Sequence, residues 1–202
     1  RRAPFHIREF RQAVATLIDR EFVAQTVLQG TAQPLATLVP PGNAYWHNPR
    51  VKVWGQGMSR AQRVAEAVRL LKEAGFRWAR EPEVDLSRDT YQPGEGLRLP
   101  DGTPMRQVEL LAPSPGYDPL RATFALWIER WLREVGIPVR SRLADFNFIL
   151  TRTVEEQDFD MYILGWGLTL FPDYLRSFFH SSNAGPGGFN SPGYRNPDYD
   201  RL

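Results

Sequence analysis

Cysteine is absent from this chain of 202 residues, so disulfides, thiol catalysis and thiolate metal ligands are excluded. No apolar run reaches the length of about 18 residues that a transmembrane helix needs. Lysine is scarce, because Lys52 and Lys72 are the only two and the other basic residues are arginines interleaved with acidic ones. The net charge is only +2, without a basic patch, and we therefore expect no nucleic-acid partner.

Histidine is also rare, and its positions argue against a metal site. His6, His47 and His180 lie far apart, and none falls in a spacing such as HxxxH or HExxH, which places two ligands on one helical face. The segment Gly165-Trp166-Gly167 lacks the third glycine and the helix start of a phosphate-binding loop. Since no GxSxG nucleophile motif is present either, we expect no metal, no cofactor, no catalytic residue and no enzyme.

The chain does contain enough apolar material for a folded core, with 42% hydrophobic and 12% aromatic residues. Its two ends lack the usual signals of termini. Residues 1–5 have no apolar signal-peptide core, and the last four residues carry no signal that stops a fold. We expect a piece of a longer protein.

The first quarter of the chain predicts helices and then a loop. Apolar residues recur at helical spacing over residues 7–28, with Asp19 placed to cap a second helical piece and Gly30 to end it. Residues 31–59 are rich in Pro, Gly and Asn and predict a long ordered loop packed by its aromatic residues. These aromatic residues are Tyr45, Trp46 and Trp54.

A helix follows the loop, because Ser59 and Gln62 form a capping box before an apolar stripe, and Gly75 stands where a left-handed cap is expected. Residues 77–104 are polar and broken by Pro and Gly. They predict a short strand followed by a turn-rich insertion or hairpin.

The rest of the chain alternates between strands and helices. We expect strands at 106–112, 137–143 and 159–165, and helices at 119–135 and 145–156. This βαβαβ order predicts an α/β fold with a layered parallel sheet and flanking helices. Residues 181–197 are rich in Gly, Asn and Pro and predict an irregular tail that Phe189 and Tyr194 could pin.

Ligands of such sheets bind beyond the carboxyl ends of the strands, which indicates residues 113–118 and 166–173. Trp166 is the more informative residue there, because Gly165 and Gly167 let a ligand approach the backbone and the indole closely. The alternative is a core tryptophan. Asp173 is either a ligand carboxylate or the N-cap of a helix over 174–179, and we favour the cap.

A second acidic group interrupts the pattern near the third strand. Asp158 and Asp160 flank Phe159 and imitate a catalytic carboxylate pair. Together with Glu155 and Glu156 they more simply form a solvated turn from helix to strand, and we favour that interpretation.

Several motifs resemble, in the same order, those of the family 5 extracellular solute-binding proteins, which include dipeptide, oligopeptide and nickel-type binding proteins. The first is Arg11-Gln12-Ala13 continuing to Asp19-Arg20, similar to the RQAxxxxxDR signature of that family. The others are Val39-Pro40-Pro41, Leu70-Leu71-Lys72-Glu73-Ala74-Gly75-Phe76, Gly136-Ile137-Pro138-Val139, Phe159-Asp160-Met161, Gly165-Trp166-Gly167, Pro172-Asp173 and residues 190–199.

The resemblance implies a periplasmic-binding-protein-like lobe of type II, similar to cluster C. Residues 1–202 would form a single lobe, the smaller one, which closes on ligand against a larger lobe that this chain lacks. It implies ligand contacts after the Gly-Trp pair, and we expect them at Gly165, Trp166, Gly167, Thr169 and Asp173.

Position 169 departs from the pattern of the peptide binders. Those proteins place an Asp three residues after the Trp, where it pairs with the amino terminus of the peptide, and this chain has Thr169. A neutral hydroxyl cannot form that ion pair. Asp173 is the nearby carboxylate that could replace it, at a different spacing.

Family resemblance also implies the partners: a peptide or similar small solute, and the membrane subunits of an ABC importer. It implies a monomer located outside the cytoplasmic membrane, in the periplasm or held by a lipid anchor as a lipoprotein. Two alternatives remain open: a relative that acts as a ligand sensor or chaperone, and a hydrolase whose catalytic groups lie partly outside the chain.

Overall fold

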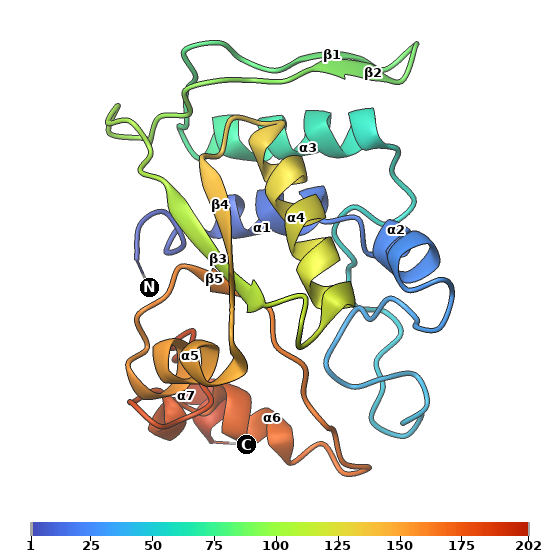
Figure 1. Cartoon of the computed structure of the whole chain (residues 1–202), viewed down its shortest axis with the longest axis vertical. Helices are drawn as coiled ribbons and strands as arrows, with labels where there is room; N and C mark the ends of the chain where they lie inside the picture. The colour runs from blue at the N-terminus through green and yellow to red at the C-terminus, as the bar shows by residue number, and fades with distance from the viewer. Residues whose placement is uncertain (1, 202) are drawn as a thin grey trace.

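A parallel three-stranded sheet lies at the centre of the fold, as the alternating pattern predicts. The computed structural model describes residues 2–201. The strands are β3 (Val108–Pro113), β4 (Val139–Ala144) and β5 (Met161–Tyr162), in the order β4-β3-β5. β3 and β4 pair in parallel from Val108↔Val139 to Pro113↔Ala144. Figure 1 shows the sheet between a helical end that carries α3 and a second end that carries α5, α6 and α7.

The third strand is much shorter than the predicted 159–165. β5 pairs with β3 only at Leu110↔Met161 and Leu111↔Tyr162. Just before it, the Asp160 carboxylate takes the place of a backbone partner and accepts the backbone N–H of Glu109 at 3.0 Å.

Asp160 is not part of a solvated turn, which corrects the interpretation favoured from the sequence. Its side chain is only 7% exposed and forms a two-pronged ion pair with Arg106, one N–O distance being 2.8 Å. Burial raises the pKa of Asp160, but the bonds from Arg106 and from the Glu109 N–H outweigh burial and lower the pKa below its ordinary value. Asp158 does lie in an exposed setting, where it pairs with Arg2 and Arg152.

Helices cover the sheet on one side. α4 (Pro119–Arg133) packs on β3 and β4, and α1 (Arg8–Leu17) packs against α3 (Arg60–Glu73). Their inward faces form one core because apolar residues recur at helical spacing. The largest fully buried apolar residues of this core include Phe10, Leu17, Leu71, Leu110 and Leu132.

The predicted helix ends are confirmed where a local cap sets them. Asp19 caps α2 (Arg20–Phe22) by accepting the N–H of Phe22 at 3.0 Å, and a π-helical segment, Val23–Val27, continues it. Ser59 and Gln62 form both bonds of the capping box at the start of α3. Gly75 follows α3 with φ +87°, the left-handed conformation that glycine adopts at no steric cost.

The segment after α3 forms the predicted hairpin, of strands β1 (Glu83–Asp85) and β2 (Thr90–Gln92). It lies over α3 (Figure 1). Trp78 anchors the segment by donating its indole N–H to the carbonyl of Val135 at 2.7 Å. No helix within residues 2–201 is both long and apolar enough to cross a membrane.

The loop at residues 31–59 has no helix or strand, as predicted, but its aromatic residues do not all pack it. Trp54 packs against the core. Tyr45 is 86% exposed and Trp46 49% exposed, and the two rings contact each other edge to face. The prediction that aromatic packing orders the loop is therefore wrong for Tyr45 and Trp46. The loop is held instead by hydrogen bonds, including those from Arg20 to the carbonyls of Leu35 and Trp54.

The C-terminal part contains α5 (Phe146–Leu150), a π-helical segment (Thr151–Glu155), α6 (Tyr174–Phe179), a short 3-10 turn (Ser181–Asn183) and α7 (Pro197–Asp200). The predicted irregular tail is organised by Asn190, which is fully buried. Its amide donates to the carbonyls of Phe179, His180 and Tyr194, and its oxygen accepts the N–H of Tyr194. Tyr194 packs on Phe179, as the prediction of a pinning residue requires.

One buried cation joins the N-terminal helices to the end of the long loop. The Arg63 guanidinium, 2% exposed, donates to the carbonyls of Thr16 and Met58 and pairs with Asp19. A Cβ at Gly55 would overlap this guanidinium and lie 2.6 Å from the Thr16 carbonyl oxygen, so only glycine fits there.

We predict different costs for two neighbouring glycine substitutions. Gly55 and Gly57 both have positive φ, but a Cβ at Gly57 meets nothing within 4 Å. Gly57→Ala should cost about 1 kcal/mol of unfolding free energy from backbone strain. Gly55→Ala should cost about 3 kcal/mol or more, because it also displaces a buried charge. Urea unfolding of the intact protein measures both, and equal losses would contradict the role given to Arg63.

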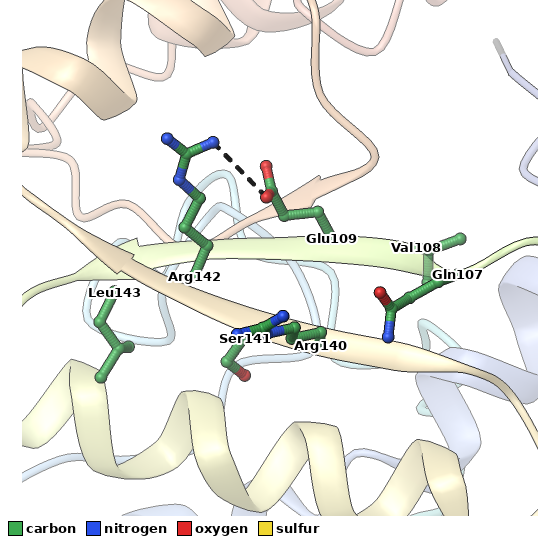
Figure 2. A pocket seen from close by; sticks show the side chains of 7 residues that line it. All are labelled: Gln107, Val108, Glu109, Arg140, Ser141, Arg142 and Leu143. Carbon is green, nitrogen blue, oxygen red and sulfur yellow. Dashed lines mark ion pairs between the residues drawn. The ribbon is translucent and has the colours of Figure 1, made fainter.

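The outer edge of β4 has no strand partner within the described residues, and two side chains of α4 cover it. Glu129 accepts the N–H of Ser141 at 2.6 Å, and Arg133 donates to the carbonyl of Val139 at 2.9 Å. Figure 2 shows the groove beside this strand, with Arg142 and Glu109 forming an ion pair on the face that points away from Ser141. The edge is thus protected from pairing with another chain.

Removing this cover should promote association. We expect the double variant Glu129→Ala, Arg133→Ala to form dimers or larger species as its concentration rises, measured by light scattering after size exclusion. The matched control is Arg69→Ala, Glu73→Ala, which removes an ion pair of equal helical spacing from α3. Identical masses for both double variants at all concentrations would refute the protective role.

Candidate functional site

The candidate site lies where the strands end, and two loops distant in sequence build it. The chain leaves β5 and runs without regular structure to α6, and the loop of residues 31–59 lies against this segment. The side chain of Asn43 donates to the carbonyl of Leu170. The hydroxyl of Tyr174 donates to the carbonyl of Leu38 at 3.1 Å. These two bonds tie the loops into one wall.

Trp166 lies in this wall and is not a core residue. Its indole is held edge to face by Phe178 and Phe189, with ring centroids 5.0 and 5.1 Å away. The residue remains 38% exposed, so part of the ring is free to meet a ligand. The predicted core alternative is therefore wrong, and the position suits an apolar or stacking contact.

Gly165 and Gly167, predicted together as ligand contacts, differ in their surroundings. A Cβ at Gly165 would overlap the guanidinium of Arg121 and lie 2.7 Å from its central carbon, whereas a Cβ at Gly167 would meet nothing within 4 Å. The space at Gly165 is thus filled by Arg121 and that at Gly167 is open. Arg121 also pairs with Asp118 at 2.8 Å, in the first turn of α4.

Thr169 and Asp173 lie together in the exposed part of the segment. The Thr169 hydroxyl is 3.1 Å from the Asp173 carboxylate and 2.8 Å from the carbonyl of Phe171, with both oxygens placed to accept. Asp173 occupies the N-cap position of α6, but its side chain makes no capping bond. The predicted helix over 174–179 and its N-cap residue are therefore confirmed, but the carboxylate contacts Thr169 and not a backbone N–H of the helix.

The second predicted loop, residues 113–118, adds an aromatic pair at the same edge of the sheet. The ring of Tyr117, which follows β3, stacks on Phe146, which follows β4, with centroids 5.3 Å apart. Tyr117 is 57% exposed. Each of the three strands is therefore followed by an aromatic residue at its carboxyl end: Tyr117, Phe146 and Trp166.

One Ser, His and Asp group gathers next to α6, and its geometry is not that of a catalytic triad. Ser182 contacts Nδ1 of His180 at 2.8 Å, and Asp200 lies 4.0 Å from the same nitrogen. A triad requires the two partners on opposite ring nitrogens. Within residues 2–201, no three His, Asp or Glu side chains are grouped to hold a metal ion.

Sequence reasoning missed Arg121 and Asn43. Asp118-Pro119 marked the start of a helix and so placed Arg121 in its first turn, close to the sheet edge, but its contact with Gly165 joins distant segments. Asn43 is buried, and its backbone carbonyl accepts the N–H groups of Trp46 and His47 where the loop turns. No local motif distinguishes it from the other polar residues of the loop.

Comparisons with known proteins bear on the family and the fold of this chain. Residues 1–186 match the sequence model of a protein family described as bacterial extracellular solute-binding proteins, family 5 Middle. The oligopeptide-binding protein AppA of Bacillus subtilis is 25% identical over 98% of this chain, and protein XP55 of Streptomyces lividans is 26% identical over 96%. The chain spans about a third of these relatives, 32% and 31% of their lengths.

Solved structures show the same fold. AppA in complex with a nonapeptide superposes with a TM-score of 0.75 at 25% identity, over 98% of this chain and 35% of that one. NikZ from Campylobacter jejuni, in complex with Ni(L-His), superposes with a TM-score of 0.74 at 21% identity, over 99% of this chain and 35% of that one. The α/β periplasmic-binding-protein-like fold expected from the sequence is confirmed.

The match over residues 1–186 covers both loops of the candidate wall as well as the sheet. This chain belongs to the bacterial extracellular solute-binding proteins of family 5.

Proposed function

We propose that this chain is the ligand-closing lobe of a two-lobed protein that captures a peptide or similar small solute and delivers it to an ABC importer. The observation that carries the proposal is the wall built by residues 31–59 and 163–173, which presents a partly exposed Trp166 at the carboxyl edge of a parallel sheet. Such edges are where open α/β sheets bind ligands.

Each residue of the wall has a definite role in this proposal. Trp166 supplies apolar area, Gly167 gives access to the backbone, and Thr169 and Asp173 supply polar groups at the exposed edge. Gly165 acts indirectly, because its missing side chain lets Arg121 reach the edge. Closure follows if the solute contacts this wall and the facing lobe at once, since that favours the closed state.

The partners follow from the same proposal. The membrane subunits of an importer receive the solute, and the protein works outside the cytoplasmic membrane as a monomer, with a lipid anchor as one means of staying there. The covered edge of β4 supports the monomer, because it removes the readiest surface for self-association. The proposed role is binding and release, with no catalytic step and no cofactor.

The solute need not be a peptide with a free amino terminus. Thr169 stands where related peptide binders have an Asp, and the carboxylate of Asp173 lies 3.1 Å from the Thr169 hydroxyl. Because the neutral hydroxyl at position 169 cannot form an ion pair, a peptide bound through its backbone, or an uncharged solute, fits this position better than an ammonium group.

Truncating the tryptophan should weaken binding in the intact protein. Trp166→Ala should lower solute affinity about tenfold, because the exposed part of the indole loses its buried apolar contact. Trp166→Phe is the matched control, since it keeps an aromatic ring between Phe178 and Phe189. Isothermal titration with solute recovered from the native protein measures both, and unchanged affinity in the alanine variant would remove Trp166 from the site.

Restoring a carboxylate at position 169 should change ligand preference. Thr169→Asp should increase affinity for a peptide with a free amino terminus about tenfold, through a charge-assisted bond. The same peptide with an acetylated terminus should gain nothing. Thr169→Asn controls for shape, because Asn has the size of Asp but carries no charge. Equal effects of Asp on both peptides would show that position 169 does not face the amino terminus.

A further inference from the structure

A second hollow lies beside the candidate wall, between the long loop and α6. Its volume is about 540 Å³. Leu35, Leu38 and Trp46 of the loop face Leu175 and Phe179 of α6 across it. No charged side chain lines this cavity within the described residues, and its polar side chains are those of Thr37 and Asn48. Its size falls within the range of about 300–1,000 Å³ that ligand pockets occupy.

Several backbone polar groups of the loop wall already form hydrogen bonds within the protein. Arg20 donates to the Leu35 carbonyl at 3.1 Å, and Tyr174 donates to the Leu38 carbonyl at 3.1 Å. The Val39 carbonyl accepts a hydrogen bond from Nδ1 of His47 at 2.8 Å. The Val39 N–H donates to the Thr37 hydroxyl at 3.2 Å. Most of the side chains that line the cavity are apolar, so an occupant would meet mainly apolar surface.

Tyr174 connects this cavity to Trp166. Its hydroxyl fixes Leu38 in the cavity wall, while its ring lies 6.2 Å from Phe178, the residue that packs on Trp166. The cavity and Trp166 thus lie on two flanks of the same short helix. A ligand group in the cavity and one on Trp166 can belong to one extended solute.

We propose that this cavity is an apolar subsite that takes a leucine-sized or larger apolar side chain of the solute. The inference rests on the proposed solute-binding function and adds the chemical class of the group recognised here. A charged or amide group would lose its hydration and find few partners in this lining. An apolar group gains from burial without that cost.

The test uses synthetic nonapeptides, the peptide length seen with the Bacillus relative. In an alanine-based host, a single Leu is moved through each position, and a second series carries Asn instead. At one position or more, the intact wild-type protein should bind the Leu peptide about tenfold more tightly than the Asn peptide, measured by isothermal titration. Trp46→Ala should bring that preference close to parity, because Trp46 forms part of the cavity wall.

Tyr45→Ala is the matched control. Tyr45 is the neighbour of Trp46, contacts its ring and is 86% exposed, but does not line the cavity. Its truncation should leave the Leu preference unchanged. A preference that persists in Trp46→Ala would overturn the subsite while solute binding itself stands.

Two further results would also overturn the subsite. If Trp46→Ala weakens all peptides equally or alters the oligomeric state, the cavity is covered by another part of the protein or by a second copy. If the wild-type protein binds none of the peptides, while refolding and thermal melting show it to be folded, peptide binding fails along with the subsite.

Discussion

The buried guanidinium of Arg63 is the constraint on which the N-terminal half depends. It joins α3 to the turn between α1 and α2 and to Met58, and it pairs with Asp19 and Glu21. Burial lowers the pKa of Arg63, and the two carboxylates oppose that shift, so the net result is a lowered pKa. A buried charge is tolerated only when its donors are satisfied. This network therefore holds the end of the loop at residues 31–59 through Met58, and Arg20, which follows Asp19, holds the loop at Leu35 and Trp54.

The candidate wall forms where this loop is hydrogen-bonded to the segment that follows β5. Asn43 and Tyr174 bind the loop to the segment that leaves β5, through one carbonyl on each side. A loop already held at four points loses little conformational entropy when a ligand arrives. The exposed residues Tyr45 and Trp46 are then presented by a hydrogen-bonded frame and do not need to pack the loop themselves. Their exposure, which contradicted the sequence prediction, follows from this division of roles.

The parts of the fold that sequence predicts are those set by local chemistry. The capping box at Ser59, the cap at Asp19 and the left-handed Gly75 each depend on residues within a few positions. The late start of β5 was not predictable in this way, because the Asp160 carboxylate takes the place of a backbone partner before the strand, through a contact with Glu109. In the candidate site, Trp166 was predicted because it follows an apolar segment. Arg121 was missed because its place is set by a glycine distant in sequence.

The electrostatics of the wall have a further consequence for specificity. Arg121 is paired with Asp118, and the Asp173 carboxylate lies against the neutral Thr169 hydroxyl. An anionic solute group meets Asp118 beside Arg121, whereas a cationic group can pair with the exposed Asp173, because a carboxylate accepts more than one hydrogen bond. In the proposed two-lobed protein, the solute shifts the population toward the closed state only by the contacts it makes in that state. On this lobe, the partly exposed indole of Trp166 offers apolar area that a solute would bury in the closed state, and this contact would supply part of that difference.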